Sequence, residues 1–111
     1  MSDCLFCKIA ADEIPSDRVY EDDRVIVFRD IYPKASVHLL MIPRRHIDSL
    51  ATVTDEDRDL LGYMLAKAPD IARDAGLDGG FRTIINTGAD GGQEVFHIHL
   101  HILGGSKLPF A

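Results

Sequence analysis

Three of the five histidines in this chain alternate with large apolar residues in the run His97-Ile98-His99-Leu100-His101-Ile102-Leu103. Strict alternation is the period of a β-strand, so the pattern predicts a strand over Val95–Gly104 with all three imidazoles on one face. The apolar residues between them share the other face, which can pack on a core. Neighbours on one face lie about 6.6 Å apart, so one small ion can bind two adjacent histidines but hardly all three. We therefore expect separate imidazoles with separate roles, the alternative being a half-exposed strand with solvated histidines.

The length of 111 residues predicts a single domain over residues 1–111 with a small core. No apolar run approaches the roughly 20 residues of a membrane span, and no signal segment opens the chain, so we expect a cytoplasmic protein that binds no membrane. The net charge of −6 argues against a nucleic-acid surface. A small phosphate ligand is still compatible with this charge, because local amides and imidazoles can bind it.

The hydrophobic pattern predicts an α+β domain with a mostly antiparallel sheet. Its expected elements are a helical turn over residues 4–11, a hairpin of Val19–Glu21 and Val25–Arg29, a strand over Val37–Pro43, a helix over residues 60–75, and strands over Phe81–Asn86 and Val95–Gly104. Thr54 is a good N-cap before the helix, and Gly76 is expected to end it. Pro69 is expected to kink the helix or to split it in two.

The loop over residues 87–94 contains three glycines and leads directly into the histidine row. Glycines allow backbone N–H groups to approach an anion closely, so a phosphate bound there would face His99 or His101. The alternative is a hairpin loop that uses Asp-Gly for its turn. Beside the histidine row, phosphate binding is the favoured interpretation. Asn86 is either a turn residue or a donor to the ligand, and His38 alone would be a buried core histidine.

Cys4 and Cys7 have the Cys-x-x-Cys spacing that chelates one zinc ion when histidines supply the other ligands. His46 and His97 are the available histidines at the ends of predicted strands. The alternatives are two ordinary reduced cysteines and a redox pair, although no strand precedes Cys4 as a thioredoxin-like motif needs. In a cytoplasmic chain, thiols or metal ligands are expected before a disulfide.

The row His97–Leu103 resembles the His-φ-His-φ-His-φ-φ signature of the histidine triad (HIT) family, and in particular its Hint branch of nucleoside phosphoramidases. Other segments that resemble the family run across nearly the whole chain: Glu13-Ile-Pro15, Glu21-Asp-Asp23, Phe28-Arg-Asp30, His38-Leu-Leu-Met-Ile-Pro43, Asn86 and Gly91-Gly-Gln93. The resemblance implies a HIT-like fold. This fold is a five-stranded, mostly antiparallel sheet with one long helix, here interrupted by Pro69, and a short N-terminal helix. It also implies that the sheet continues across a homodimer.

The resemblance further implies a hydrolase that acts on nucleotides at the α-phosphorus through a nucleotidyl-histidine. His99 matches the nucleophile, and an imidazole with an ordinary pKa of about 6.5 is neutral enough at pH 7 for this role. His101 matches the residue that contacts the phosphate. His38 matches a fourth histidine that orients the nucleophile and takes part in proton transfer. The implied substrate is a purine nucleotide such as an AMP derivative, and the implied activity is that of a purine nucleoside 5′-monophosphoramidase. A dinucleoside polyphosphate hydrolase and a nucleotidyl transferase are the alternative activities at the same site.

The remaining substrate contacts are also implied by the resemblance. Asp30 matches a carboxylate that holds the ribose hydroxyls. The residues that match the apolar base pocket are Leu5, Phe6, Ile14 and Ile31, and those that match the phosphate side are Asn86, Gly92, Gln93 and Glu94. The implied cofactor is a structural zinc ion, with no organic cofactor. Its implied ligands are Cys4, Cys7, His46 and His97.

Three features depart from the family pattern. Glu94 stands where animal members commonly have Ser, Pro69 interrupts a helix that is usually continuous, and the tail over Leu108–Ala111 is short. In a dimer this tail is expected near the partner's site. Two other functions are open: a zinc hydrolase that binds its metal through His97 and His99, and a non-catalytic nucleotide-binding protein on the same scaffold.

Overall fold

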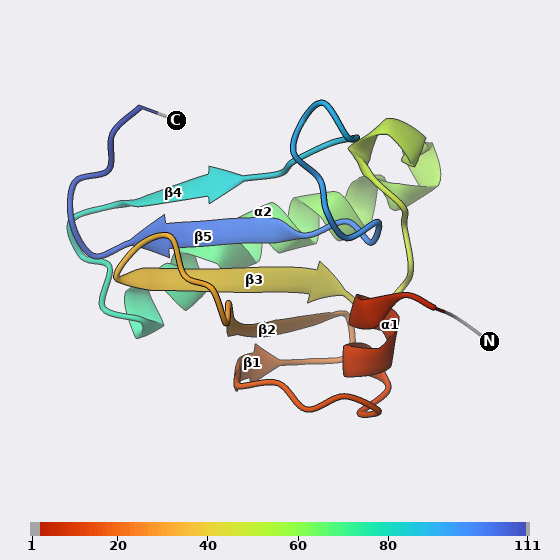
Figure 1. Ribbon diagram of the computed structural model, residues 1–111, viewed down its shortest axis with the longest axis horizontal. Helices are drawn as coiled ribbons and strands as arrows, with labels where there is room; N and C mark the ends of the chain where they lie inside the picture. The colour runs from red at the N-terminus through yellow and green to blue at the C-terminus, as the bar shows by residue number, and fades with distance from the viewer. Residues whose placement is uncertain (1–2, 111) are drawn as a thin grey trace.

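The structure, a computed structural model, describes residues 3–110. Its helices and strands follow one another as α1 (Leu5–Ala10), β1 (Arg18–Glu21), β2 (Val25–Arg29), β3 (Val37–Pro43), α2 (Arg58–Asp74), β4 (Phe81–Ile84) and β5 (Leu100–Gly104), with 3-10 turns at Leu50–Thr52 and Asp55–Asp57. The strands form one five-stranded antiparallel sheet in the order β1-β2-β3-β5-β4 (Figure 1). The predicted α+β class is confirmed. Within residues 3–110, no helix is long and apolar enough to cross a bilayer.

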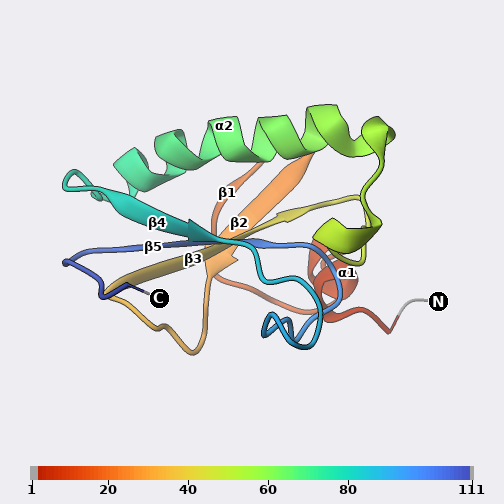
Figure 2. The same cartoon turned by 90° about the horizontal axis from the view of Figure 1, so that it is seen from above.

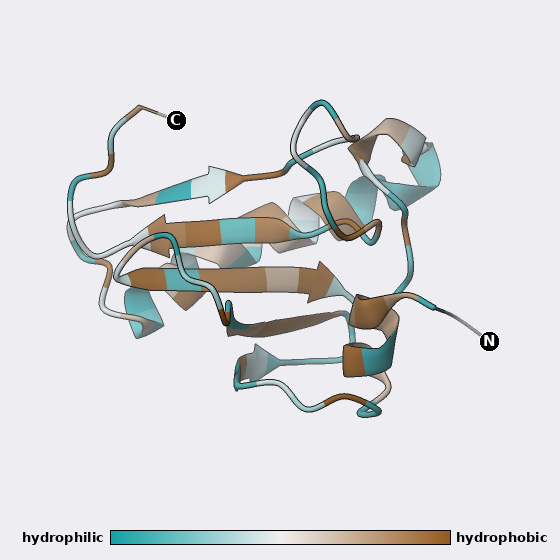
Figure 3. Ribbon diagram, viewed as in Figure 1, coloured by the Kyte–Doolittle hydropathy of each residue, from teal (hydrophilic) through white to brown (hydrophobic). Residues whose placement is uncertain are grey.

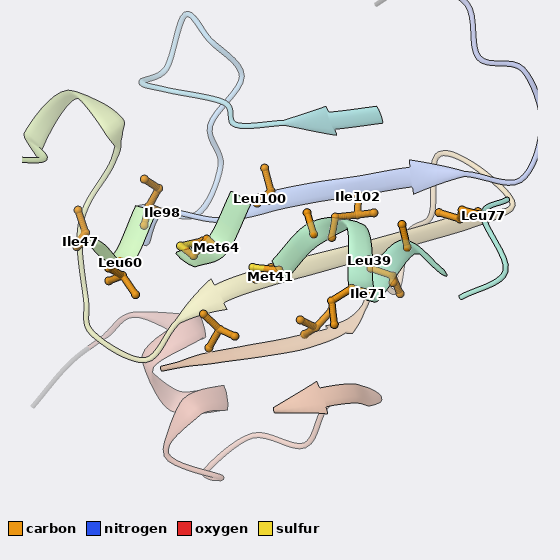
Figure 4. Close-up of a cluster of buried hydrophobic side chains, with 14 residues drawn as sticks. Leu39, Met41, Ile47, Leu60, Met64, Ile71, Leu77, Ile98, Leu100 and Ile102 are labelled. Carbon is orange, nitrogen blue, oxygen red and sulfur yellow. The ribbon is translucent and has the colours of Figure 1, made fainter. Parts of the chain in front are cut away.

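The two faces of the sheet are covered by different elements. Helix α2 lies across one face, whereas α1 and the loop before β5 lie on the other (Figure 2). The larger core fills the space between α2 and the sheet, and ten of its side chains are labelled in Figure 4: Leu39, Met41, Ile47, Leu60, Met64, Ile71, Leu77, Ile98, Leu100 and Ile102. A smaller cluster packs under α1: Phe6, Ile9, Ile26, Phe28, Leu40 and Ile42. Because β2 and β3 bury side chains on both faces, their sequences are mostly apolar, as the brown colour of most of β3 shows in Figure 3.

The predicted strand over Val95–Gly104 is too long, because β5 begins only at Leu100. The ladder between β3 and β5 ends at the pair Met41 and Leu100. Beyond that pair, the carbonyl of Pro43 accepts a hydrogen bond from the imidazole of His97 instead of from a strand backbone. The His97 side chain thus supplies the hydrogen bond that the backbone of a neighbouring strand would otherwise supply. Residues 95–99 are therefore not part of the strand.

The alternation of the histidine row nevertheless separates two faces as predicted. Ile98, Leu100 and Ile102 all lie in the core beneath α2. The imidazoles of His97 and His99 instead contact the ring of Phe6 on α1, on the opposite side of the sheet. The periodic pattern therefore predicted the orientation of the side chains correctly although only part of the run is a strand.

Two other boundaries differ from the prediction. Strand β4 ends at Ile84 and not at Asn86, because the Asn86 side chain bonds to Gly91 and begins the loop. Helix α2 continues through Pro69 and is not split. Pro69 cannot donate a backbone hydrogen bond, but Ala68 and Ile71 on either side of it are buried in the core and hold the helix in place.

Thr54 caps the 3-10 turn Asp55–Asp57 that leads into α2, and not α2 itself. Its side chain accepts from the backbone N–H of Glu56, while the Asp57 carboxylate accepts from the backbone N–H of Thr54. This reciprocal pair is a capping box, so the sequence located the start of the helical segment but not its 3-10 first turn.

Candidate functional site

A pocket of about 700 Å³ opens on the face of the sheet opposite α2. Residues from α1, from the segments after β2 and β4, and from the histidine row form its walls. The predicted site residues that line it are Leu5, Phe6, Ile14, Asp30, Ile31, His38, Asn86, Gly92, Glu94, His99 and His101. Gln93 is the predicted substrate contact that does not line the pocket. The fold therefore brings together predicted site residues that lie up to 96 positions apart in the chain, from Leu5 to His101.

The imidazoles of His38 and His101 are joined by a hydrogen bond of 2.9 Å between Nε2 of His38 and Nδ1 of His101. The other ring nitrogen of His38 accepts a hydrogen bond of 3.0 Å from the backbone N–H of Lys34. A neutral imidazole has one donor and one acceptor nitrogen, so His38 carries its proton on Nε2 and donates it to His101. The proton of His101 must then be on Nε2. The carboxylate of Asp30, 3.4 Å from Nε2 of His38, is a second acceptor beside this pair.

Both members of this pair are neutral at pH 7. Burial lowers the pKa of His38 below its ordinary value. Burial also lowers the pKa of His101 to about 4, and the neighbouring His99 and His38 lower it further. His101 therefore offers a neutral N–H donor, not a positive charge.

His99 is held in one tautomer by the backbone carbonyl of His97. Its Nδ1 lies 2.8 Å from the carbonyl oxygen of His97, and a carbonyl can only accept a hydrogen bond. Nδ1 must therefore carry the proton, which leaves a lone pair on Nε2. The ring is 5.1 Å from that of His101 and 5.0 Å from that of Phe6, and it is buried to 7% exposure. This geometry fixes an imidazole nitrogen lone pair, which could act as a nucleophile, beside the ring of His101.

The glycine loop, residues 87–93, closes tightly between β4 and the histidine row. Gly88 and Gly92 have φ angles of +74° and +83°, which favour glycine, and a Cβ on Gly91 would lie 2.3 Å from the Thr87 carbonyl oxygen. The Asn86 side chain donates a hydrogen bond of 2.8 Å to the carbonyl of Gly91. The glycines are therefore required by the shape of the loop, which places Gly92 and Asn86 in the pocket wall.

Cys4, Cys7, His46 and His97 form a second group of side chains next to the pocket. Because these four residues could be metal ligands, the group is called the metal cluster below. The Sγ atom of Cys4 lies 3.3 Å from Nδ1 of His97, and Sγ of Cys7 lies 3.2 Å from Nδ1 of His46. All four ligand atoms lie within 4.8 Å of one another. Ligands bonded at about 2.0–2.3 Å to one tetrahedral ion lie roughly 3.5 Å apart, so these donors could hold a metal ion.

The imidazoles of this metal cluster are oriented for binding. Nε2 of His46 lies 2.6 Å from a carboxylate oxygen of Asp48, and Nε2 of His97 lies 2.8 Å from the Pro43 carbonyl. Each Nε2 therefore donates its proton, and each Nδ1 presents a lone pair to the cysteines. Burial lowers the pKa of His97, which keeps that ring in its neutral, metal-binding form. The donor types and their orientation thus fit a metal ion.

Asp30, His38 and His101 also lie close enough together to suggest a metal site. Both ring nitrogens of His38 are already engaged, one by the backbone of Lys34 and one by His101. This group is better described as a hydrogen-bonded relay than as a set of ligands.

Several pocket residues were missed from the sequence. Arg82 lines the pocket and donates a hydrogen bond of 3.4 Å to the Leu108 carbonyl, so the tail contributes to this wall. The period of β4 places Arg82 on the same face as Asn86 and could have identified it. Lys34 contributes through its backbone N–H, for which the sequence has no signal. Tyr32 lines the rim with a largely exposed ring.

Comparison with known proteins identifies the family. A family model described as "Scavenger mRNA decapping enzyme C-term binding" matches residues 3–110. Protein HitA of Neisseria gonorrhoeae is 57% identical over 104 residues, which cover 94% of this chain and 97% of HitA. The chain belongs to the histidine triad (HIT) family.

Solved structures confirm the HIT fold. A HIT family hydrolase from Legionella pneumophila superposes with a TM-score of 0.95 at 48% identity, and the match covers 97% of each chain. A histidine triad protein from Clostridium difficile gives the same TM-score at 50% identity, covering 100% of this chain and 97% of that one. The short N-terminal helix, the long helix and the five-stranded sheet of this HIT chain therefore belong to a shared architecture.

Proposed function

We propose that this HIT protein hydrolyses purine nucleoside 5′-monophosphoramidates, such as amides of AMP, through a nucleotidyl intermediate on His99. The observation that carries the proposal is the fixed tautomer of His99, whose Nε2 lone pair belongs to a residue of the pocket wall. A nucleophile of this kind divides hydrolysis into two displacements at one phosphorus atom.

In the first displacement, Nε2 of His99 bonds to the α-phosphorus and the phosphorus–nitrogen bond to the leaving amine breaks. The amine leaves with the electron pair and takes a proton from solvent. The proton on Nδ1 of His99 stays in place, and the His97 carbonyl stabilises the positive ring. The N–H of His101 donates to a phosphoryl oxygen. In the second displacement, water attacks the phosphorus, its proton goes to solvent, and His99 leaves with its original lone pair.

The other walls of the pocket suit the rest of a nucleotide. Leu5, Phe6 and Ile14 offer apolar surface for a purine base. Asp30 is a carboxylate acceptor for ribose hydroxyls, and its position is fixed by the backbone N–H of Tyr32 at 2.8 Å. Gly92 of the glycine loop and Asn86, which line the pocket, are the proposed contacts of the phosphate.

The test is a reaction with adenosine 5′-phosphoramidate, quenched in alkaline denaturant and analysed by mass spectrometry. We expect AMP release and one adenylyl group on the peptide that contains His99. Faster hydrolysis of a dinucleoside polyphosphate under the same conditions would instead favour a dinucleoside polyphosphate hydrolase that uses the same site. Binding of AMP with no turnover of either compound would favour a non-catalytic nucleotide-binding protein.

We also propose that the metal cluster binds one zinc ion, because two cysteine sulfurs and two imidazole nitrogens are a zinc donor set. When bound, the ion supplies a cross-link between α1 and the segments that carry His46 and His97. Four protein ligands leave no open coordination position for substrate. This favours a structural role of the ion over the alternative of a zinc hydrolase that binds its metal through His97 and His99. Chelation that abolishes turnover without destabilising the protein would support that alternative.

A homodimer is the third part of the proposal. The core buries most of the apolar face of α2 but leaves Leu65 53% exposed. Strand β4 lies at the edge of the sheet, and its Phe81 is 41% exposed. Pairing about a two-fold axis would cover an unpaired edge and these apolar side chains together.

A further inference from the structure

Gln93 is a buried polar residue that the proposed reaction does not use. Its side chain is 5% exposed and does not line the pocket, although the family pattern suggests a contact on the phosphate side. A buried amide is costly unless its donors and acceptor are satisfied, so its partners indicate what it holds together.

The amide of Gln93 joins the glycine loop to two other segments. Its Oε1 accepts a hydrogen bond of 2.8 Å from the backbone N–H of Gly88, at the far end of the loop. Its Nε2 donates to the carbonyl of Asp48 at 2.8 Å and to that of Val95 at 3.1 Å. The backbone N–H of Gln93 also donates to the Gly88 carbonyl at 3.0 Å. The loop is therefore closed and anchored by one residue.

The anchoring segment carries a metal ligand. The Asp48 carboxylate accepts the proton on Nε2 of His46 and thereby turns Nδ1 toward the cysteines. Between them, the Ile47 carbonyl accepts a hydrogen bond of 2.7 Å from the backbone N–H of Ile98, next to His97. A shift of residues 46–48 would thus move a ligand of the metal cluster and the support of the glycine loop together.

We propose that Gln93 is a positioning residue that couples the glycine loop to the metal cluster, so that a bound nucleotide and a bound metal ion stabilise each other's sites. The coupling rests on the proposed nucleotide binding. Binding linkage is reciprocal: if the metal raises nucleotide affinity by some factor, the nucleotide raises metal affinity by the same factor. The effect can therefore be measured at the metal, without following turnover.

The experiment measures the Kd for zinc of the intact protein by equilibrium competition with a chromogenic chelator, with and without saturating AMP. AMP is expected to lower this Kd about fivefold or more in the wild type, at the lower end of typical coupling factors. In Gln93→Leu, which loses all three side-chain hydrogen bonds, AMP is expected to lower the Kd for zinc less than about twofold, and the Kd for AMP is expected to rise about tenfold.

Gln93→Glu provides a second variant if the leucine variant does not fold. A carboxylate can still accept from the N–H of Gly88 but cannot donate to the Asp48 carbonyl, so the effect of AMP on the Kd for zinc is expected to fall as in Gln93→Leu. The matched control is Asp59→Asn, because this exposed side chain lies on α2 and does not line the pocket. The control is expected to behave as the wild type.

The outcomes separate the two proposals. If AMP binds the wild type but does not change the Kd for zinc, or lowers it equally in the Gln93 variants, the coupling is overturned and the proposed function stands. If the wild type takes up no zinc, the coupling is overturned as well. If AMP and adenosine 5′-phosphoramidate do not bind the wild type, the proposed function is overturned and the coupling with it.

Discussion

Nδ1 of His99 donates its hydrogen bond to the backbone carbonyl of His97, and the side chain of His97 belongs to the metal cluster. One residue therefore serves two sites through different atoms. Whatever fixes the imidazole of His97 also fixes the carbonyl that selects the tautomer of His99. Phe6 strengthens this connection, because its ring contacts both imidazoles from α1.

Replacing the nucleophile is expected to separate chemistry from binding. His99→Ala removes Nε2 but leaves the glycine loop and Asp30 in place, so the Kd for AMP is expected to stay within about threefold. Turnover of adenosine 5′-phosphoramidate is expected to fall by at least about a thousandfold, as for other deleted nucleophiles. Single-turnover kinetics and calorimetry give the two quantities. Turnover near the wild-type rate would remove His99 from the mechanism.

Loss of a metal ligand is expected to affect stability more than the chemical step. Cys7→Ser is expected to reduce zinc well below about one ion per chain by elemental analysis and to lower Tm. Turnover per folded molecule is expected to change less, with the larger part of the change in KM. Lys8→Gln, on the same helix but outside the donor set, is the control. A variant of unchanged Tm that has lost its turnover would contradict the structural role.

The stability of the protein is expected to depend on pH through His101. Its pKa of about 4 in the folded protein lies below the ordinary 6.5, so between these values the unfolded chain binds more protons. The free energy of unfolding is therefore expected to rise with pH from about 4 to about 6.5 and to level off above. Urea unfolding at several pH values tests this. His101→Asn keeps the metal cluster and is expected to show a weaker slope, whereas equal slopes would refute the assignment.

Two partly buried hydrogen bonds to Asp22 are expected to tie α2 to the hairpin of β1 and β2. Its carboxylate accepts from the hydroxyls of Tyr20 and Tyr63, and Arg24 lies over the Tyr63 ring at 4.5 Å. Burial alone would raise the pKa of Asp22, but the hydrogen bonds outweigh it and hold that pKa below its ordinary value. Tyr63→Phe is expected to cost about 1–2 kcal/mol in urea unfolding. Tyr32→Phe, at an exposed ring, is expected to cost nothing measurable.

The dimer proposal is tested by the mass in solution. Light scattering at micromolar concentration is expected to give about twice the chain mass of 12.3 kDa. Phe81→Lys places a charge on the edge strand and is expected to shift the mass toward that of one chain. Val19→Lys, at a similarly exposed apolar side chain on the other edge strand, is the control. A wild-type mass near 12.3 kDa would refute the dimer.

The sequence predicted which residues share a face more reliably than where elements begin and end. Alternation over residues 97–103 placed the imidazoles opposite the core, since side-chain direction follows from local geometry. It did not predict that β5 starts at Leu100, because the competing partner of the Pro43 carbonyl is a side chain 54 positions away. The persistence of α2 through Pro69 likewise depends on core contacts, which the local pattern does not contain.

In the candidate site, too, the local pattern predicted some features, whereas others depend on contacts between distant segments. Except for Gln93, the catalytic and substrate-binding residues named from the family pattern line the pocket, because a motif records chemistry that is tied to specific side chains. The contribution of Lys34 is a backbone N–H, which any residue except proline could supply, so no side-chain pattern reveals it. Gln93 was placed on the phosphate side, and only its three side-chain hydrogen bonds show that it supports the loop from behind.

The metal cluster joins segments that are far apart in the chain, since the contact between Cys4 and His97 spans 93 residues. During synthesis, the first two ligands emerge early and the fourth only when β5 is about to follow. The complete ligand set can therefore form only after most of the sheet can assemble, and closing so long a loop is slow and entropically costly. Tight metal binding would accordingly occur only in the completely folded chain. A nascent or truncated chain that lacks His97 would bind the ion weakly and exchange it with solvent.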